Sequence, residues 1–270
     1  MEAESMDNQQ KTVWITGASS GIGRSFALAY AKKGYRLILT ARRKERLEKL
    51  SETVKEISGS QSRILAADLS LEGECYRICR KLKEERLDIF INNAGFGVCG
   101  EFGRTSLERE LSMVDVNIRA MHILFKYAVR KMKNQGGGTI LNVGSSAGLF
   151  PGGPYMGAYY ASKAYVVSLT RAVAQELREK KSPVKVYVLC PGPVDTEFNE
   201  SVGVKFALKG ITPECCVEKA LAGMEGKNPV IVPTRLLRLG IRFQWMLPKP
   251  LLLWIIARQQ KKKLYSADIP

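Results

Sequence analysis

The feature that most constrains the fold is a regular alternation of short apolar runs with longer amphipathic stretches. Seven runs have the composition and length of strands: Thr12–Thr16, Arg36–Thr40, Arg63–Ala67, Asp88–Ile91, Gly138–Val143, Val184–Leu189 and Val230–Val232. Six stretches between them have the apolar pattern of helices: Gly21–Lys33, Lys44–Ile57, Leu71–Glu85, Leu107–Lys133, Tyr159–Glu179 and Pro213–Met224. This order predicts an α/β protein with a doubly wound parallel sheet of about seven strands and helices on both faces.

No stretch rich in proline, glycine or serine divides these elements, and the sequence contains no internal repeat. We therefore expect a flexible polar N-terminus over residues 1–10 and a single domain over residues 11–233. A basic, amphipathic helical tail should follow over residues 234–270.

A glycine-rich turn, TGASSGIGR, follows the first predicted strand and opens the first predicted helix. Glycines let the backbone turn tightly and approach a pyrophosphate, while the helix N-terminus offers N–H groups and a positive dipole end. A glycine-rich turn alone is a weak signal, but its position at the start of a βαβ unit makes it a strong one. The sequence thus predicts a Rossmann-like, dinucleotide-binding sheet, with the phosphates contacting Gly17, Ser19, Ser20, Gly21, Ile22 and Gly23.

The Gly-xxx-Gly-x-Gly spacing of this turn resembles that of the short-chain dehydrogenases/reductases. The sequence NNAG at Asn92–Gly95 and the Tyr-xxx-Lys pair at Tyr159–Lys163 are similar to further motifs of the family. The resemblance extends from about Lys11 to Pro233. It implies an enzyme that transfers a hydride between a nicotinamide dinucleotide and a carbonyl or alcohol group.

The end of the second predicted strand carries Arg42 and Arg43, where NAD-preferring folds place an acidic residue. An acid would repel a 2′-phosphate, whereas a guanidinium can bind it through two hydrogen bonds. The sequence therefore predicts NADP(H), with Arg42 as the contact because it matches the family position. The alternative is that both arginines only begin a charged helix.

The resemblance also assigns the remaining cofactor contacts. Asp68 matches an aspartate at the adenine, and Val194 and Thr196 match positions at the nicotinamide carboxamide. The full set beyond the glycine-rich turn and Arg42 is Asp68, Leu69, Asn93, Ala94, Gly95, Tyr159, Lys163, Pro191, Gly192, Val194 and Thr196.

Two tyrosines precede a lysine at helical spacing. Reduction of a ketone needs a proton donor, and a neighbouring ammonium lowers the pKa of a tyrosine. Tyr159 and Tyr160 lie four and three residues before Lys163, so both share its helix face and spacing leaves the choice open. The family motif implies that Tyr159 is the acid/base and that Lys163 tunes it. Asn117, in VNIRA, would complete the catalytic set by binding a water that relays protons.

The catalytic serine, which would orient the carbonyl, has two candidates. Counting thirteen residues back from Tyr159, the usual family interval, selects Ser146. Aligning the preceding strand and Gly148 with the family motif selects Ser145 instead. We favour Ser145, because the loop that follows can accept an extra residue more easily than the strand end.

The formal net charge is +16, and the last 36 residues hold eight basic side chains and one acid. Such a balance suits nucleic acid, an anionic membrane or phosphorylated ligands, but no nucleic-acid-binding motif is present. The tail could lie on a membrane, pack over the substrate cleft or form a subunit contact. The six cysteines and the lone His122 predict no metal site. The polar N-terminus predicts a cytoplasmic protein that can be peripheral to a membrane.

Together these features predict an NADPH-dependent reductase of a hydrophobic or acyl-bearing substrate. The substrate would lie between the loop Leu149–Met156 and a lid over Asp195–Gly210. The resemblance implies a homodimer or homotetramer built through Leu107–Lys133 and Tyr159–Glu179. The alternative is a non-catalytic, dinucleotide-sensing regulator, although such proteins commonly lose the tyrosine or lysine that this chain keeps.

Overall fold

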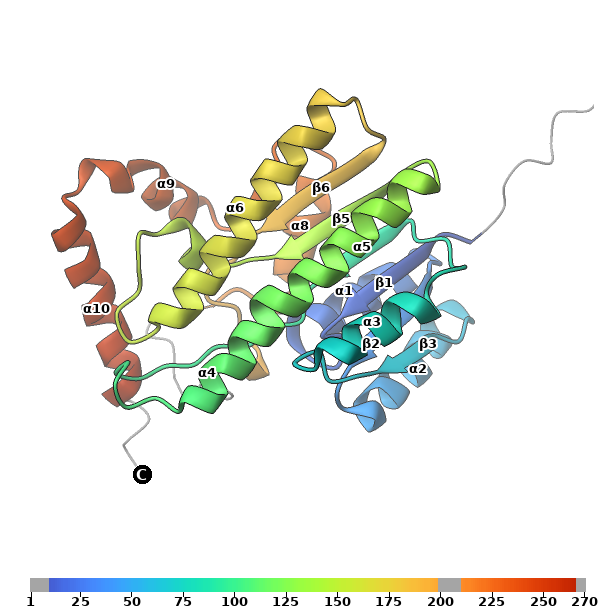
Figure 1. Ribbon diagram of the computed structural model, residues 1–270, viewed down its shortest axis with the longest axis horizontal. Helices are drawn as coiled ribbons and strands as arrows, with labels where there is room; N and C mark the ends of the chain where they lie inside the picture. Colours follow the sequence, from blue (N-terminus) through green and yellow to red (C-terminus); the bar gives the residue numbers. More distant parts are fainter. Residues whose placement is uncertain (1–9, 199–209, 266–270) are drawn as a thin grey trace, which may run out of the picture.

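The computed structural model describes residues 10–198 and 210–265, with side chains described as far as Lys261. Seven parallel strands form one sheet in the order β3-β2-β1-β4-β5-β6-β7 (Figure 1). They are β1 (Thr12–Thr16), β2 (Arg36–Ala41), β3 (Arg63–Ala66), β4 (Ile89–Asn92), β5 (Gly138–Val143), β6 (Val184–Leu189) and β7 (Val230–Ile231). The expected α/β fold with about seven strands is confirmed.

Helices cover both faces of the sheet. One face carries α3 (Glu72–Lys81), α4 (Leu107–Val114), α5 (Met121–Asn134) and α6 (Gly157–Glu179). The other face carries α1 (Gly21–Ala31), α2 (Lys44–Ser58) and α8 (Pro213–Met224). A π-helical segment, η1 (Asp115–Ala120), joins α4 to α5, so the long helix expected over Leu107–Lys133 contains a local change of helical register.

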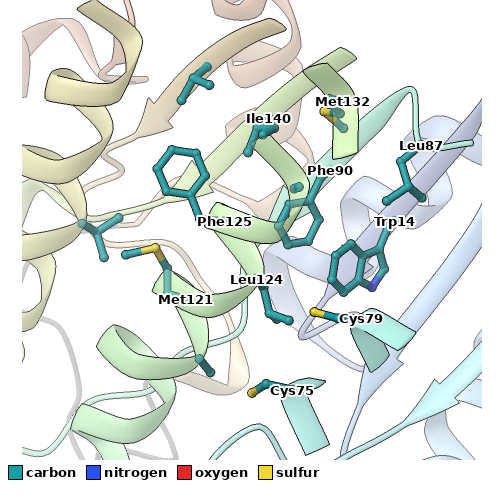
Figure 2. Packing of buried hydrophobic residues seen from close by; sticks show 14 of the residues in the cluster. Trp14, Cys75, Cys79, Leu87, Phe90, Met121, Leu124, Phe125, Met132 and Ile140 are labelled. Carbon is teal, nitrogen blue, oxygen red and sulfur yellow. The ribbon is translucent and has the colours of Figure 1, made fainter. Parts of the chain in front are cut away.

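Side-chain alternation along the strands explains the two layers. In β1, Trp14 points to one core with Phe90 of β4, and the two rings stack at 4.1 Å (Figure 2). Its neighbours Val13 and Ile15 point to the opposite core, beneath α1 and α2. Because both faces of each central strand are buried, the strands read as nearly continuous apolar runs.

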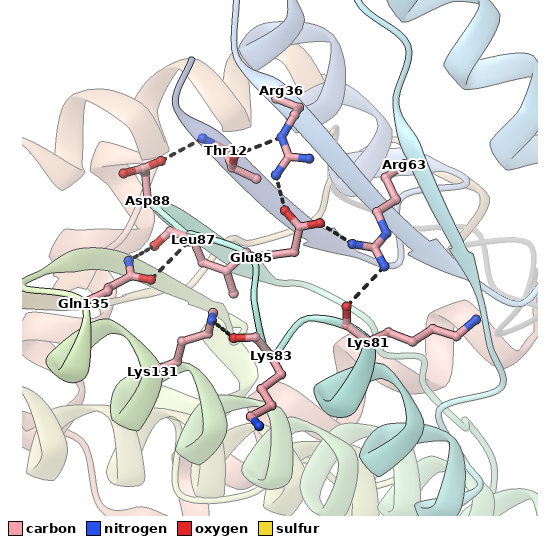
Figure 3. Close-up of polar contacts among 10 residues, drawn as sticks. All are labelled: Thr12, Arg36, Arg63, Lys81, Lys83, Glu85, Leu87, Asp88, Lys131 and Gln135. Carbon is pink, nitrogen blue, oxygen red and sulfur yellow. Dashed lines mark hydrogen bonds and ion pairs between the residues drawn. The ribbon is translucent and has the colours of Figure 1, made fainter. Parts of the chain in front are cut away.

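The amino ends of the strands are held by polar contacts. Glu85 forms ion pairs with Arg36 and Arg63, and Asp88 accepts a hydrogen bond from the backbone N–H of Thr12 at 2.8 Å (Figure 3). Gln135, at the end of α5, bonds the backbone of Leu87. These contacts hold the amino ends of neighbouring strands in place, at the end of the sheet opposite the carboxyl ends.

The tail folds back onto the molecule. It forms α9 (Arg235–Phe243), the short helix η3 (Gln244–Met246) and α10 (Lys249–Tyr265), which lie beside the start of α6 in Figure 1. The Gln244 side chain donates a hydrogen bond to the carbonyl oxygen of Leu149 at 2.8 Å. Gly152 is so close to Leu253 that an added Cβ would lie 3.3 Å from it. The tail therefore packs against the loop between β5 and α6.

Candidate active site

A cavity of about 980 Å³ lies at the carboxyl ends of the strands. It opens where the strand order reverses between β1 and β4, the position at which open α/β sheets bind ligands. The strand ends and the loops that follow them line one side. Residues of α9 and α10 line the other side, so we call this space the central cavity.

The glycine-rich turn borders the central cavity. Gly17 and Gly21 have φ angles of +65° and +51°, which glycine adopts without strain. The expected contacts that line the cavity here are Gly17, Ser19, Ser20, Gly21 and Ile22. Gly23 is buried and does not line it; a Cβ there would collide with the carbonyl oxygen of Gly17. Gly23 instead allows α1 to pack closely beneath the turn.

Both arginines after β2 line the cavity, and both are exposed. The Arg43 guanidinium lies 3.3 Å from the hydroxyl of Ser20 and 3.4 Å from that of Ser19, so it reaches the glycine-rich turn itself. It also forms an ion pair with Glu197 at 3.3 Å. Arg43 therefore contacts the glycine-rich turn, while Arg42, which the family match favoured, lines the same cavity.

The next strands contribute polar and backbone groups. Asp68 and Leu69 line the cavity after β3, where the Asp68 carboxylate accepts hydrogen bonds from the N–H and hydroxyl of Ser70. Asn93 follows β4 and its side-chain amide donates to the carbonyl oxygen of Thr16 at 2.9 Å. This bond joins the ends of β1 and β4. Ala94 and Gly95 line the cavity beside it.

Asn117 is buried in η1 and does not itself line the cavity. Its side-chain amide donates to the carbonyl oxygen of Phe96 at 2.9 Å and to the hydroxyl of Ser162 at 3.1 Å, and it accepts from the Phe96 N–H. A Cβ on Gly95 would lie 2.8 Å from Asn117 Oδ1 and 3.3 Å from Lys163 Nζ. Asn117 and Lys163 therefore both lie next to Gly95, at a position where a larger residue would not fit.

Tyr159 and Lys163 meet inside the cavity on one face of α6. Tyr159 is 8% exposed and Lys163 is 5% exposed. Burial raises the pKa of Tyr159 to about 12, against the lowering effect of a hydrogen bond with Ser145. Burial lowers the pKa of Lys163 to about 8. Removal from water thus has the largest effect on the Tyr159 pKa in this arrangement, and the tuning of Tyr159 by Lys163 stays a prediction.

The two serines have different surroundings. Ser145 lies close enough to Tyr159 for its hydroxyl to lower the Tyr159 pKa, and that hydroxyl accepts a hydrogen bond from the N–H of Ala147 at 3.1 Å. Ser146 begins the short helix η2 (Ser146–Leu149), and its N–H donates to the carbonyl oxygen of Pro191 at 2.8 Å. Both line the cavity, but the contact with Tyr159 belongs to Ser145.

The segment after β6 passes across the cavity. Pro191, Gly192, Val194 and Thr196 all line it. Val194 pairs with Ile211 in an isolated parallel bridge, which fixes this segment near α8. Thr196 lies against the glycine-rich turn, since a Cβ on Gly21 would be 3.1 Å from its methyl group.

The outer wall of the cavity is mostly apolar and comes largely from the tail. Its apolar side chains are Phe150, Met156, Phe198, Leu236, Leu237, Leu239, Phe243, Leu252, Ile255 and Ile256. Of the three positions expected for the tail, the one over the cleft is thus observed. The lid expected over Asp195–Gly210 lies outside the described residues except for its two ends, as does most of the N-terminus over residues 1–10.

Residues set aside on sequence grounds lie elsewhere. The His122 ring contacts the hydroxyl of Tyr165 at 2.7 Å on the outer surface of α5 and α6. Cys75 and Cys79 are buried in the same core as Trp14, with Cys79 the nearer of the two (Figure 2). Within residues 10–198 and 210–265, no three metal-ligating side chains gather into a possible metal site, and no helix is long and apolar enough to span a membrane.

Comparison with known proteins agrees with this geometry. The family model described as short chain dehydrogenase matches residues 11–205. An oxidoreductase of Thermotoga maritima is 37% identical over 194 residues, which cover 71% of this chain and 75% of that protein. The human 3-oxoacyl-(acyl-carrier-protein) reductase is 32% identical over 203 residues, covering 74% and 83% respectively. A short-chain dehydrogenase from Sphingobium yanoikuyae, solved in complex with NADPH, is 30% identical with a TM-score of 0.79 and 96% coverage of both chains.

Fold, site and relatives define an oxidoreductase that acts on CH–OH or C=O groups with a nicotinamide dinucleotide. Within that class, the chain belongs to the short-chain dehydrogenase/reductase family.

Sequence reasoning gave the position over the cleft as one of three for the tail but named none of its wall residues. The stretch Leu252–Gln260 contributes one side of the cavity from α10, yet it lies about a hundred residues after Tyr159 and follows no family motif. The sequence does contain one indication of this wall: Leu252, Ile256 and Gln260 are four residues apart, which places all three on one face of a helix.

Proposed function

We propose that this protein is an NADPH-dependent reductase of bulky, hydrophobic ketones. The observation that carries the proposal is the position of the Tyr159 hydroxyl beside Ser145 in a cavity whose outer wall is apolar. The cavity joins this pair to the glycine-rich turn, so one continuous space can hold a dinucleotide and a substrate. NADPH bound there would supply the hydride.

The residues around the cavity fit a dinucleotide. The positive φ angles of Gly17 and Gly21 leave the turn free of side chains, and α1 begins at the same place. Arg42 and Arg43 would bind a 2′-phosphate. Of the two acidic residues that line the cavity, Asp68 and Glu197, the second pairs with Arg43. The preference for NADP(H) over NAD(H) rests on these two guanidinium groups.

Each catalytic residue has a defined task in this proposal. Tyr159 donates its proton to the oxygen of the reduced carbonyl, and its raised pKa keeps it protonated at neutral pH. Ser145 donates a hydrogen bond that orients the carbonyl. Lys163 holds the ribose and stabilises negative charge that forms on Tyr159. Asn117 holds the backbone at Phe96 and takes part in proton relay through a water.

The apolar wall supports the substrate class. Side chains of α9 and α10 face the reacting end across the cavity, so a small polar carbonyl compound would leave most of this surface in water. Burying apolar area stabilises a complex by roughly 25 cal/mol per Å². A large apolar ketone or acyl compound therefore gains more from this site than a small one.

The tail also supports a location on membranes. Five exposed apolar side chains of the tail lie outside the cavity lining: Trp245, Met246, Leu247, Leu251 and Trp254. No Asp or Glu occurs between residues 234 and 265, while eight lysines and arginines do. Tryptophan and basic side chains on one amphipathic surface suit an anionic membrane interface. We propose a cytoplasmic enzyme that binds such a surface peripherally.

Two points of organisation are also proposed. Residues 11–233 form the catalytic domain and residues 234–270 its tail. A homodimer or homotetramer would form through α4–α5 and α6, which lie side by side on the outer face of the molecule (Figure 1). Gel filtration with light scattering tests the assembly directly.

The experiment that tests the proposed reaction is NADPH consumption by the full chain. Ketosteroids, 3-oxoacyl thioesters, quinones and simple ketones would be offered at equal concentration. Faster turnover of the large apolar carbonyls than of acetone or acetoacetate is expected. Turnover of only small, polar carbonyls would contradict the proposed substrate class.

A further inference from the structure

Gln260 of α10 is a buried polar residue in the apolar wall of the central cavity. Its side chain lines the cavity and the residue is only 4% exposed. The amide Nε2 donates a hydrogen bond to the Tyr160 hydroxyl at 2.9 Å. The amide oxygen Oε1 is buried without a hydrogen-bond partner among the described residues. Such unpaired acceptors are rare in folded proteins, because loss of water without a replacement bond is unfavourable.

The position would otherwise suit an apolar side chain. Leu252 and Ile256 precede Gln260 at intervals of four residues, are both buried and both line the cavity. The inward stripe of α10 is thus leucine, isoleucine and then glutamine. Packing alone would be satisfied by a third apolar residue, so the amide introduces a cost that only a hydrogen-bonding partner would remove.

Tyr160 connects this amide to the reacting end of the cavity. Its ring packs directly on Gly153, where no side chain would fit, and stands edge-on to the Tyr159 ring with centroids 6.4 Å apart. Tyr160 therefore has a fixed position, and its hydroxyl fixes the amide. Gln260, with its unpaired Oε1, therefore belongs to the lining of the same cavity as Tyr159.

We propose that Gln260 and Tyr160 form a subsite for a hydroxyl group of the substrate, remote from the carbonyl that is reduced. The free group is an acceptor, so it selects a donor on the ligand. The substrate class is then a hydrophobic ketone that carries a hydroxyl group at its far end. This inference rests on the proposed function for the reaction, but the binding preference can be measured without turnover.

Two pairs of ketones test the subsite, and they differ in the distance between the ketone and the hydroxyl group. The pairs are 4-phenylbutan-2-one with 4-(4-hydroxyphenyl)butan-2-one, and 5α-androstan-17-one with its 3-hydroxy derivatives. In each pair the hydroxyl is electronically isolated from the ketone. The dissociation constants are measured by calorimetry on the full chain saturated with NADP⁺, and kcat/KM by NADPH oxidation. At least one hydroxylated ketone should bind about tenfold or more tightly than its parent.

Gln260→Met keeps the length of the side chain and removes the amide. It should abolish the preference by weakening the hydroxylated ketone alone, while the parent ketone binds as before or better. Gln259→Met is the matched control, since Gln259 is the exposed neighbour at the rim of the same cavity and should leave the preference intact. The methyl ether of the preferred compound should bind like the parent, because it cannot donate.

Tyr160→Phe is the second variant and should reduce the preference by releasing the amide. Equal binding within both pairs, binding of neither pair, or an equal loss for both members in Gln260→Met would each overturn the subsite. A binding preference that disappears in Gln260→Met without any turnover would support the subsite and contradict the proposed reaction. Turnover of ketones without any preference for the hydroxylated compound would support the proposed reaction and contradict the subsite.

Discussion

The Lys163 ammonium group lies 5.9 Å from the centre of the Tyr159 ring and donates a hydrogen bond to the carbonyl oxygen of Val143 at 3.0 Å. The carbonyl at the end of β5 therefore holds the lysine ammonium group near the tyrosine ring. Both groups are buried, so each pKa moves toward the neutral form: up for Tyr159 and down for Lys163.

This arrangement predicts how reduction depends on pH. Tyr159 stays protonated up to a pKa of about 12 and can donate its proton throughout the neutral and mildly alkaline range. Lys163 carries its charge only below a pKa of about 8. If the charge stabilises the tyrosinate that forms, kcat/KM for ketone reduction should be level near pH 7 and fall about tenfold per pH unit above 8. A level profile to pH 10 would contradict this role of Lys163.

Replacement of the tyrosines separates their roles. Tyr159→Phe should lower kcat by roughly 10²- to 10⁴-fold, the range for loss of a general acid, while NADPH still binds. Tyr160→Phe is the matched control and should retain substantial turnover of a ketone that lacks a hydroxyl group. Steady-state kinetics and NADPH fluorescence titration measure the two effects. Similar losses of kcat in both variants would contradict the choice of Tyr159.

The serine pair is tested in the same way. Ser145→Ala should lower kcat strongly, because the side chain beside Tyr159 is lost. Ser146→Ala should have a smaller effect. The backbone N–H of Ser146 makes the hydrogen bond to Pro191, so the substitution leaves this bond in place. The reverse order of activities would assign the role to Ser146.

Much of the fold was accessible from sequence, and the reasons are local. All seven strands were predicted because strands such as β1 and β2 are buried on both faces and are mostly apolar over a short run. The glycine-rich turn and the Tyr159–Lys163 pair were found because their spacing is short. The Arg43 contacts with Ser19 and Ser20 and the position of Gln260 in the wall depend on tertiary packing, which short spacing does not encode.

Cofactor preference should depend on both arginines after β2. Arg42→Glu and Arg43→Glu should each weaken NADPH by about tenfold or more, because a charge-assisted hydrogen bond contributes about 1.5–3 kcal/mol, and should leave NADH binding less affected. Lys44→Glu is the matched control. This substitution changes the charge by the same amount, but Lys44 pairs with Glu48 and does not line the cavity. Equal dissociation constants of the native protein for NADPH and NADH would contradict the proposed preference.

Two glycines of helices should respond oppositely to alanine. Gly23→Ala puts a Cβ against the carbonyl oxygen of Gly17, so the free energy of unfolding should fall by about 1–3 kcal/mol, the range for overpacking. Gly73 lies in α3 with open space around it, and Gly73→Ala should raise stability by about 0.5–1 kcal/mol. Urea unfolding followed by circular dichroism measures both. A Gly23→Ala protein of native stability would contradict the tight packing under the turn.

Membrane binding should require both parts of the tail surface. Trp245 is 78% exposed, and its apolar ring would enter the interface while Arg235, Arg238 and Arg242 attract anionic headgroups. The full chain should therefore sediment with phosphatidylglycerol vesicles at low salt and less with phosphatidylcholine vesicles. Trp245→Ser should weaken sedimentation on anionic vesicles, whereas Phe102→Ser, an equally exposed aromatic residue outside the tail, should not. Since Trp245 does not line the cavity, ketone reduction in solution should stay unchanged. Failure of the native protein to sediment with anionic vesicles would contradict the proposed membrane contact.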